Sequence, residues 1–191
     1  SPDYAPYESL DTDGKTIVGF DADMIALFPE YLNDGDTTYK FVWHSMSFEN
    51  IVSQVQGGQV DIGVSGFTYD KSRKVAWSKP YTATAQVAVV DKDSDIKTVK
   101  DLEGKTVAAQ SGSTGEKAAK EIKDANVVSV TNVQEIFSSL TSKQYDAVVV
   151  DLAVAQNYVK EQGFVMLDES LLDEKNYIIA KEGNDEMIDM I

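Results

Sequence analysis

Strand-like and helix-like patterns alternate along residues 106–167, and this alternation limits the possible folds more than any other feature of the chain. Residues 145–150 are almost wholly apolar, as is typical of a strand buried on both faces of a sheet. The pattern predicts strands at 106–110, 127–131, 145–150 and 164–167, and helices at 116–123, 133–142 and 153–161. Such alternation predicts an α/β fold with parallel strands and right-handed crossovers.

The two ends of the chain show a related pattern. It predicts helices at 24–32 and 48–55, strands at 39–43, 60–64, 82–90 and 177–180, and a last helix at 185–191. Pro29 should kink or break the first helix, because proline lacks a backbone N–H. Ser47 is a good N-cap for the second helix, and Gly57 with Gly58 should end it.

Composition excludes several classes of function. The 191 residues suffice for one large domain or two small ones, and 32 acidic against 17 basic residues give a net charge of −15. This charge repels nucleic acid and anionic lipid. The absence of cysteine excludes disulfides, thiolate catalysis and zinc–thiolate sites, and the single histidine, His44, makes a Ser–His–Asp triad untenable. No apolar run approaches the ~20 residues that span a bilayer, no signal-peptide pattern is present, and neither a metal nor a cofactor is expected.

Residues 61–73, Asp-Ile-Gly-Val-Ser-Gly-Phe-Thr-Tyr-Asp-Lys-Ser-Arg, have the composition of a carboxylate-binding segment. We expect a strand that ends at Val64 and then a turn that begins with Ser65. Gly66 would let the backbone approach a ligand, Thr68 offers a hydroxyl, and Arg73 offers a planar fork that matches a carboxylate. Taken alone, the segment fits equally a strand, a polar turn and a surface arginine.

Polar residues also follow two other predicted strands. In open α/β sheets, ligands bind beyond the carboxyl ends of the strands. The loop 111–116 follows Gln110, and Asp151 follows the apolar strand 145–150. Ser113 and Glu116 have capping-box spacing, so the loop is either an ordinary helix cap or an anion site, and Asp151 is either a cap or a ligand residue. An arginine and an aspartate together suit a zwitterion, with Arg73 on the carboxylate and Asp151 on the ammonium group.

Aromatic and acidic residues near the start of the chain complete the candidates. Tyr4 and Phe48 could sandwich a ligand side chain, although Phe48 also belongs to the apolar stripe of its helix. Asp3 and Glu8 could read a polar or cationic side chain, or could simply be surface charges.

The chain resembles the polar amino-acid-binding proteins of the type 3 solute-binding family, which serve ABC importers. The resemblance rests on motifs that run in family order over nearly the whole chain. They are Asp-Tyr-Ala-Pro-Tyr-Glu at 3–8, Val-Gly-Phe-Asp-Ala-Asp at 18–23, the segment 61–73, Trp-Ser-Lys-Pro-Tyr at 77–81, Asp-Leu-Glu-Gly-Lys at 101–105, Gln-Ser-Gly-Ser-Thr-Gly-Glu at 110–116 and Tyr-Asp-Ala-Val-Val-Val-Asp at 145–151.

The resemblance implies a two-lobed, Venus-flytrap fold of the periplasmic-binding-protein type, in which each lobe is a mostly parallel sheet flanked by helices. Lobe 1 would comprise residues 1–86 and 178–191, and lobe 2 residues 87–177. Residues 82–90 and 177–180 would be the hinge strands. Family members also have a strand before the position of Ser1 and helices beyond that of Ile191, so we expect lobe 1 of this sequence to expose a sheet edge.

By the same resemblance, the protein binds a free L-amino acid between its lobes and delivers it to a membrane permease, as an extracytoplasmic monomer that is not an enzyme. It would lie in the periplasm or be lipid-anchored outside a Gram-positive membrane. A basic or amide ligand, namely arginine, lysine, histidine or glutamine, is favoured. The implied ligand residues are Asp3, Tyr4, Phe48, Ser65, Gly66, Phe67, Thr68, Arg73, Gln110, Ser113, Thr114 and Asp151.

In this set Arg73, Thr68 and Thr114 take the carboxylate, while Asp151 takes the ammonium group with the backbone of Ser65 or Gly66. The alternatives are an extracellular sensing domain of a receptor, and a cyclohexadienyl or arogenate dehydratase on the same fold.

Overall fold

The structure is a computed structural model that describes residues 1–33 and 35–191, and it divides into two compact units. Unit 1 comprises Ser1–Tyr81 and Asn176–Ile191, and unit 2 comprises Thr82–Lys175. The chain therefore crosses between the units twice, after Tyr81 and after Lys175. The sequence-based boundaries, 86/87 and 177/178, lie a few residues further along the chain.

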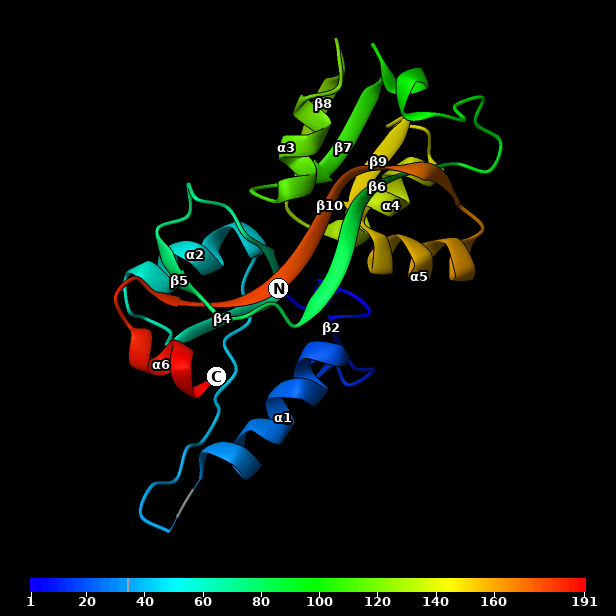
Figure 1. Ribbon diagram of the computed structural model, residues 1–191. Coiled ribbons are helices and arrows are strands. Elements are labelled where there is room, and N and C mark those ends of the chain that lie inside the picture. The colour runs from blue at the N-terminus through cyan, green and yellow to red at the C-terminus, as the bar shows by residue number, and fades with distance from the viewer. Residues whose placement is uncertain (34) are drawn as a thin grey trace. The chain divides into compact units, whose positions relative to one another are not determined.

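Unit 2 is built on a sheet with the strand order β10-β6-β9-β7-β8. These strands are β6 (Thr82–Val90), β7 (Thr106–Gln110), β8 (Asn126–Val130), β9 (Ala147–Asp151) and β10 (Val165–Lys181), whose last residues belong to unit 1. β7 pairs in parallel with both β8 and β9, which confirms the parallel pairing predicted from the alternating pattern. β6 pairs antiparallel with β9, so the sheet is mixed. Figure 1 shows β6 and β10 side by side.

The helices of unit 2 are α3 (Thr114–Lys120), α4 (Val133–Thr141) and α5 (Leu152–Gln162), with a 3₁₀ turn at Val99–Leu102. All five residues of β9 are buried, as its apolar sequence predicts for a strand covered on both faces. Phe137 of α4 stacks on Tyr158 of α5, with ring centroids 3.7 Å apart. This contact joins the two helices at the core of the unit.

Unit 1 contains two groups of strands. β1 (Asp3–Tyr4), β2 (Glu8–Leu10) and β3 (Ile17–Val18) form a small antiparallel sheet. β4 (Ile62–Thr68) and β5 (Val75–Trp77) pair antiparallel with the end of β10. The helices are α1 (Phe20–Leu32), α2 (Phe48–Gln56) and α6 (Asp185–Met190).

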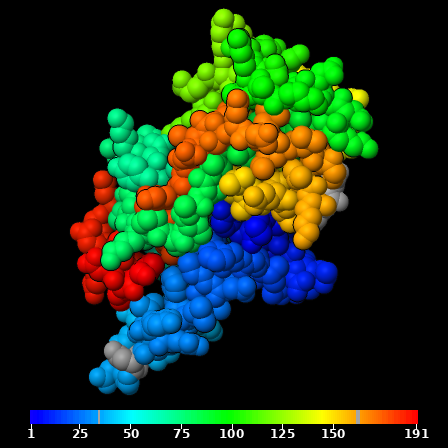
Figure 2. All heavy atoms as spheres, turned by 45° about the vertical axis from the view of Figure 1, so that its right-hand side comes forward, coloured from blue at the N-terminus to red at the C-terminus, as the bar shows by residue number. Residues whose placement is uncertain are grey.

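The helices of unit 1 differ from their sequence-based predictions in two respects. α1 neither breaks nor ends at Pro29 but continues to Leu32, and the Asn33 N–H donates to the Pro29 carbonyl. The proline removes one backbone N–H donor, but the next turn of the helix still forms its hydrogen bonds. Ser47 occupies the N-cap position of α2, yet its side chain makes no capping hydrogen bond and is instead an acceptor for the Asn50 amide. Figure 2 shows α1, in blue, at the surface, where Leu27 and Tyr31 are exposed.

The predicted strand at residues 39–43 is wrong, because residues 37–47 form no helix, strand or turn. A strand needs a hydrogen-bonded neighbour as well as β-forming residues. No strand in the described part of the chain pairs with this segment.

The predicted end of the strand at Val64 is also wrong, because β4 runs on through Ser65 to Thr68. The strands predicted separately at 164–167 and 177–180 are one strand of 17 residues, β10. None of the helices described is long and apolar enough to cross a membrane.

Candidate functional site

The unit 1 candidates gather at the end of β4. Gly66 has φ +56°, and the pairing of β4 with β10 shifts register between Tyr177 and Ile179. The segment predicted as a turn is therefore a strand with an irregularity at a glycine, as in a β-bulge. The left-handed φ is one that residues with a Cβ avoid. A Cβ at this position would also lie 3.3 Å from Cε1 of Tyr4, so the Tyr4 ring lies directly against the Gly66 backbone.

Contacts with neighbouring residues fix the backbone and the side-chain orientation of Arg73. The Arg73 N–H donates to the Asp70 carbonyl and closes the turn that follows β4. Its guanidinium Nη1 donates to the Thr68 carbonyl at 2.9 Å. The guanidinium carbon lies 5.6 Å from the ring centroid of Phe48 and 5.5 Å from that of Phe67, within cation–π distance of both. The side chain is thus oriented by one backbone oxygen and two aromatic rings.

Phe48 and Phe67 are core residues as well as neighbours of Arg73. Their rings stack with centroids 4.8 Å apart, and both belong to the buried cluster that includes Ile51, Val55 and Ile179. The core interpretation of Phe48 is therefore confirmed, and the sandwiching of a ligand side chain by this ring stays a prediction.

The remaining unit 1 candidates are buried around the same segment. Asp3 and Tyr4 form β1 and are both buried, Tyr4 stacks on Tyr7, and the Ser1 hydroxyl donates to Asp3. Thr68 Oγ1 is buried and has no hydrogen-bond partner among the described residues. A buried hydroxyl without a hydrogen-bond partner destabilises a folded protein, and a bound ligand would supply that hydrogen bond.

The unit 2 candidates lie at the carboxyl ends of β7 and β9. Gln110 ends β7, as the sequence predicts, whereas Asp151, predicted to follow its strand, is the last residue of β9. Both residues are buried. Ser113 is the N-cap of α3, because its hydroxyl accepts from the Glu116 N–H at 3.1 Å, and Thr114 begins that helix. Asp151 is the N-cap of α5, because one carboxylate oxygen accepts from the Ala153 N–H at 2.8 Å. The capping interpretations are therefore correct for both residues.

Sequence reasoning missed a buried polar row across unit 2. Gln86 of β6 lies opposite Asp151 in the strand register, and its Nε2 donates to Oε2 of Glu174 in β10 at 2.8 Å. Oε1 of Glu174 is buried without a hydrogen-bond partner in the described chain. The one sequence signal was Gln86, a lone polar residue in the otherwise apolar run 85–90. Glu174 lies in an acidic stretch that gave no sign of burial.

Sequence reasoning also missed a pair of buried acids in unit 1. Glu8 of β2 and Asp21 of α1 are 3% and 1% exposed, and the surface-charge interpretation of Glu8 is therefore wrong. Burial raises the pKa of Glu8 well above its usual value and raises the pKa of Asp21 to about 6. Burial and the neighbouring Asp21 also raise the pKa of the Tyr81 phenol.

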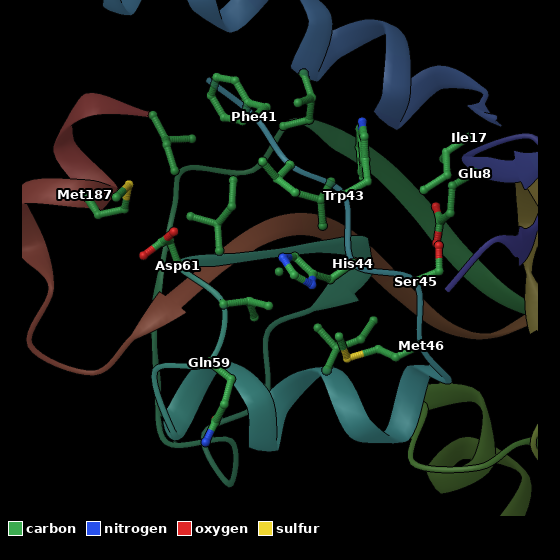
Figure 3. Close-up of a pocket in the computed structure, with 18 of the residues that line it drawn as sticks. Glu8, Ile17, Phe41, Trp43, His44, Ser45, Met46, Gln59, Asp61 and Met187 are labelled. Carbon is green, nitrogen blue, oxygen red and sulfur yellow. The ribbon is translucent and has the colours of Figure 1, made fainter. Parts of the chain in front are cut away.

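A cavity of about 280 Å³ lies elsewhere in unit 1. Its walls include residues 39–46, β4 and the end of α6, and Figure 3 shows Met187 and Glu8 at opposite ends of it. None of the candidate ligand residues is among the described residues that line it. The largely apolar lining shows no cluster of His, Asp and Glu suited to a metal ion, and no such cluster occurs elsewhere in residues 1–33 and 35–191.

Comparisons with known proteins identify the family of the chain and the type of its fold. The family model of the bacterial extracellular solute-binding proteins, family 3, matches residues 1–124. The chain belongs to this family. One similar protein is the arginine-binding extracellular protein ArtP of Bacillus subtilis (strain 168), which is 30% identical over 99% of this chain and 74% of its own length.

Solved structures of solute-binding proteins match the whole chain. Holo ArgBP from T. maritima has a TM-score of 0.89 and 33% identity, with 100% of this chain and 84% of that chain covered. The ancestral amino-acid-binding protein AncCDT-1, a precursor of cyclohexadienyl dehydratase, has a TM-score of 0.88 and 31% identity, with 100% and 83% covered. These matches confirm the predicted periplasmic-binding-protein type of fold.

Proposed function

We propose that this family 3 solute-binding protein binds a free L-amino acid with a basic or amide side chain, L-arginine first, and delivers it unchanged to an ABC-type membrane permease. Membership of an extracellular solute-binding family supports the transport role and an extracytoplasmic location. The names of the B. subtilis and T. maritima relatives support arginine. The protein would act as a monomer.

The observation that carries the proposal is the fixed orientation of Arg73. A guanidinium held by the Thr68 carbonyl and by the Phe48 and Phe67 rings is preorganised, so little side-chain entropy is lost when it pairs with a carboxylate. Thr68 Oγ1, buried without a partner in the described structure, would add a hydrogen bond to the same carboxylate. We assign these groups to the α-carboxylate of the ligand.

The other candidates take the rest of the amino acid in this proposal. Asp151, which is buried at the end of β9, takes the α-ammonium group, and Thr114 assists at the carboxylate. Tyr4 and Phe48 flank the ligand side chain, and the buried Asp3 neutralises or accepts from its far end. A buried carboxylate at that position favours a cationic or amide group over an acidic one.

Two alternatives use the same ligand site or the same fold. A receptor sensing domain would bind the same amino acid, and only the remainder of its gene would differ. A dehydratase is suggested by the likeness to AncCDT-1. Release of phenylpyruvate or phenylalanine from prephenate or arogenate by the purified protein would establish that activity, and we expect none.

The deciding experiment is isothermal titration of the full chain, stripped of ligand by unfolding and refolding, with each of the twenty amino acids. We expect micromolar or tighter binding of L-arginine, or of one of lysine, histidine and glutamine. Absence of heat with all of them, from a sample shown to be folded by circular dichroism, would overturn the proposal. Tight binding of glutamate or of an aliphatic amino acid would retain the class and refute the assignment of Asp3.

A further inference from the structure

The buried polar row of unit 2 crosses three neighbouring strands, and one end of it has no role in the function proposed above. Asp151 ends β9, Gln86 of β6 lies opposite it in the register, and β10, which carries Glu174, is the next strand of the sheet. All three residues are buried, and all three belong to unit 2. The arrangement of the row is therefore a property of this unit alone.

The first turn of α3 packs directly on this row. A Cβ on Gly115 would lie 2.5 Å from Oε1 of Gln86, so the helix backbone and the Gln86 side chain are in close contact. Thr114, which begins α3, is one of the residues that we assign to the ligand carboxylate. The row thus lies next to the assigned ligand residues of unit 2, Thr114 on α3 and Asp151 on β9.

The Glu174 carboxylate is only partly satisfied by its surroundings. Its side chain lies in a residue that is 7% exposed, and Nε2 of Gln86 donates to its Oε2 at 2.8 Å. Oε1 is buried and has no hydrogen-bond partner among the described residues, and the ion pairs of the described chain do not include this carboxylate. A carboxylate has about four acceptor sites, and a buried one is destabilising unless further donors or a cation reach it.

A second oxygen without a partner lies on the same face of β6 as Gln86. Thr84 precedes Gln86 by two residues in this strand, so the two side chains project to the same side. Thr84 Oγ1 is buried and has no hydrogen-bond partner in the described part of the chain. Oε1 of Glu174 and Oγ1 of Thr84 are therefore two oxygens that lack donors, and a ligand with several N–H groups would supply them.

We propose that Glu174 is a ligand-binding residue that selects amino acids with a cationic side chain. Its Oε1 accepts from the guanidinium of arginine or the ammonium of lysine, while Gln86 holds Oε2 in place. This role deepens the amino-acid-binding function proposed above and rests on it. It also narrows the ligand class, because a neutral side chain such as that of glutamine would leave the buried carboxylate without a counter-charge.

The two acids of the row bind different groups of the ligand in this proposal. β9 and β10 lie on either side of β6, and because adjacent strands are about 4.8 Å apart, roughly 10 Å separates the backbones that carry Asp151 and Glu174. This separation suits two cationic groups of one ligand, the α-ammonium at Asp151 and the side-chain cation at Glu174. A guanidinium has five N–H donors, so it can bond to Glu174 and to Asp3 at the same time.

The test compares each cationic amino acid with a neutral analogue of similar shape, by titration calorimetry of the full chain at neutral pH. L-Arginine is paired with L-citrulline, and L-lysine with L-norleucine. The variants are Glu174→Gln, which removes the charge, and Glu174→Asp, which keeps it. The matched control is Asp168→Asn, which neutralises an exposed acid of the same strand.

The parent and the control should bind the cationic member of a pair at least about tenfold more tightly than the neutral one. Glu174→Gln should bind the cationic member at least about tenfold more weakly than the parent does, as expected for loss of a hydrogen bond to a charged group. Its affinity for the neutral analogue should stay within about twofold of the parent's, because that analogue does not use the charge. Glu174→Asp should retain a preference for the cationic member.

The outcomes separate this proposal from the proposed function. If the parent binds none of the twenty amino acids, the function fails and the role of Glu174 fails with it. The function stands and the role of Glu174 is overturned if the parent binds glutamine but neither arginine nor lysine. The same conclusion follows if folded Glu174→Gln, checked by circular dichroism, weakens both members of a pair equally or neither of them. Equal affinity of Glu174→Asp for the two members would also overturn the role, and this variant decides the question if Glu174→Gln does not fold.

Discussion

At the scale of single residues, the candidate site depends on a few side chains whose surroundings decide their chemistry. Arg73 is oriented before any ligand arrives, because a carbonyl oxygen and two aromatic rings hold its guanidinium. Lysine would keep the charge but would lose the planar fork that pairs with a carboxylate through two bonds.

We expect Arg73→Ala to weaken L-arginine binding by ~3–5 kcal/mol, because the ligand carboxylate would be buried without its partner. Arg73→Lys should lose ~1.5–3 kcal/mol, the range for a hydrogen bond to a charged group. Titration calorimetry measures both, with the exposed neighbour Lys74→Ala as the control. Binding by Arg73→Ala within a few-fold of the parent would remove Arg73 from the site.

Gly115 illustrates a glycine retained for lack of space. A Cβ there would lie 2.5 Å from Oε1 of Gln86 and 3.3 Å from the Val149 carbonyl, so α3 packs directly on the sheet. Helix propensity alone would favour alanine at such a position by ~1 kcal/mol.

Gly115→Ala should therefore destabilise the protein by ~1–3 kcal/mol through overpacking, contrary to its propensity. Urea unfolding measures the change. Gly35→Ala is the control, since a Cβ there meets nothing within 4 Å. If Gly115→Ala is as stable as the parent, the Gln86 side chain can move aside at little cost. The buried polar row of Gln86 and Glu174 would then be less tightly packed than its burial indicates.

At the scale of elements, prediction from sequence succeeded where a segment carries its own signal. β6 and β7 have the predicted bounds, because each is a continuous apolar or β-branched run that ends at a clear break. β9 is shifted by a residue or two, since Tyr145 has the composition of a strand residue but precedes the pairing with β6 and β7.

Prediction failed where structure depends on a distant partner. Residues 39–43 have a strand-like composition but no strand beside them in the described chain, and β4 extends through Gly66 only because β10 pairs with it. The candidate site shows the same division. Gln110 and Asp151 end strands, and Arg73 lies in the turn after β4, so all three could be proposed from their positions. Glu8, Asp21 and Glu174 become notable only through long-range burial.

Hydrogen exchange should reveal this difference between elements. Backbone amides of residues 40–46 should exchange rapidly, because no secondary structure protects them. Those of β9 should be among the slowest, because β9 is fully buried between β6 and β7. Peptide-level mass spectrometry measures both. Equal protection in the two segments would contradict the unpaired state of residues 40–46.

At the scale of the whole molecule, the charge of −15 acts on stability as well as on the choice of partners. Self-repulsion among like charges opposes the compact state and is screened by salt. Raising NaCl from 10 mM to 300 mM should increase the free energy of unfolding at neutral pH by ~1 kcal/mol. The same series at pH 4, where many carboxylates are neutral, is the control and should show a smaller increase in the free energy of unfolding. If stability at neutral pH did not depend on salt, the acidic groups would be too dispersed to repel one another measurably.

The order of assembly follows from the way the chain is divided. Unit 2 is one continuous stretch, whereas unit 1 needs its first 81 residues and the chain after residue 175. During synthesis or export, the earlier part of unit 1 must wait while all of unit 2 emerges, with β4 lacking the β10 strand that completes its pairing. Unit 2 is therefore free to fold first. Until residues 176–191 emerge, residues 1–81 stay incompletely folded, and chaperones and proteases have the most time to act on them.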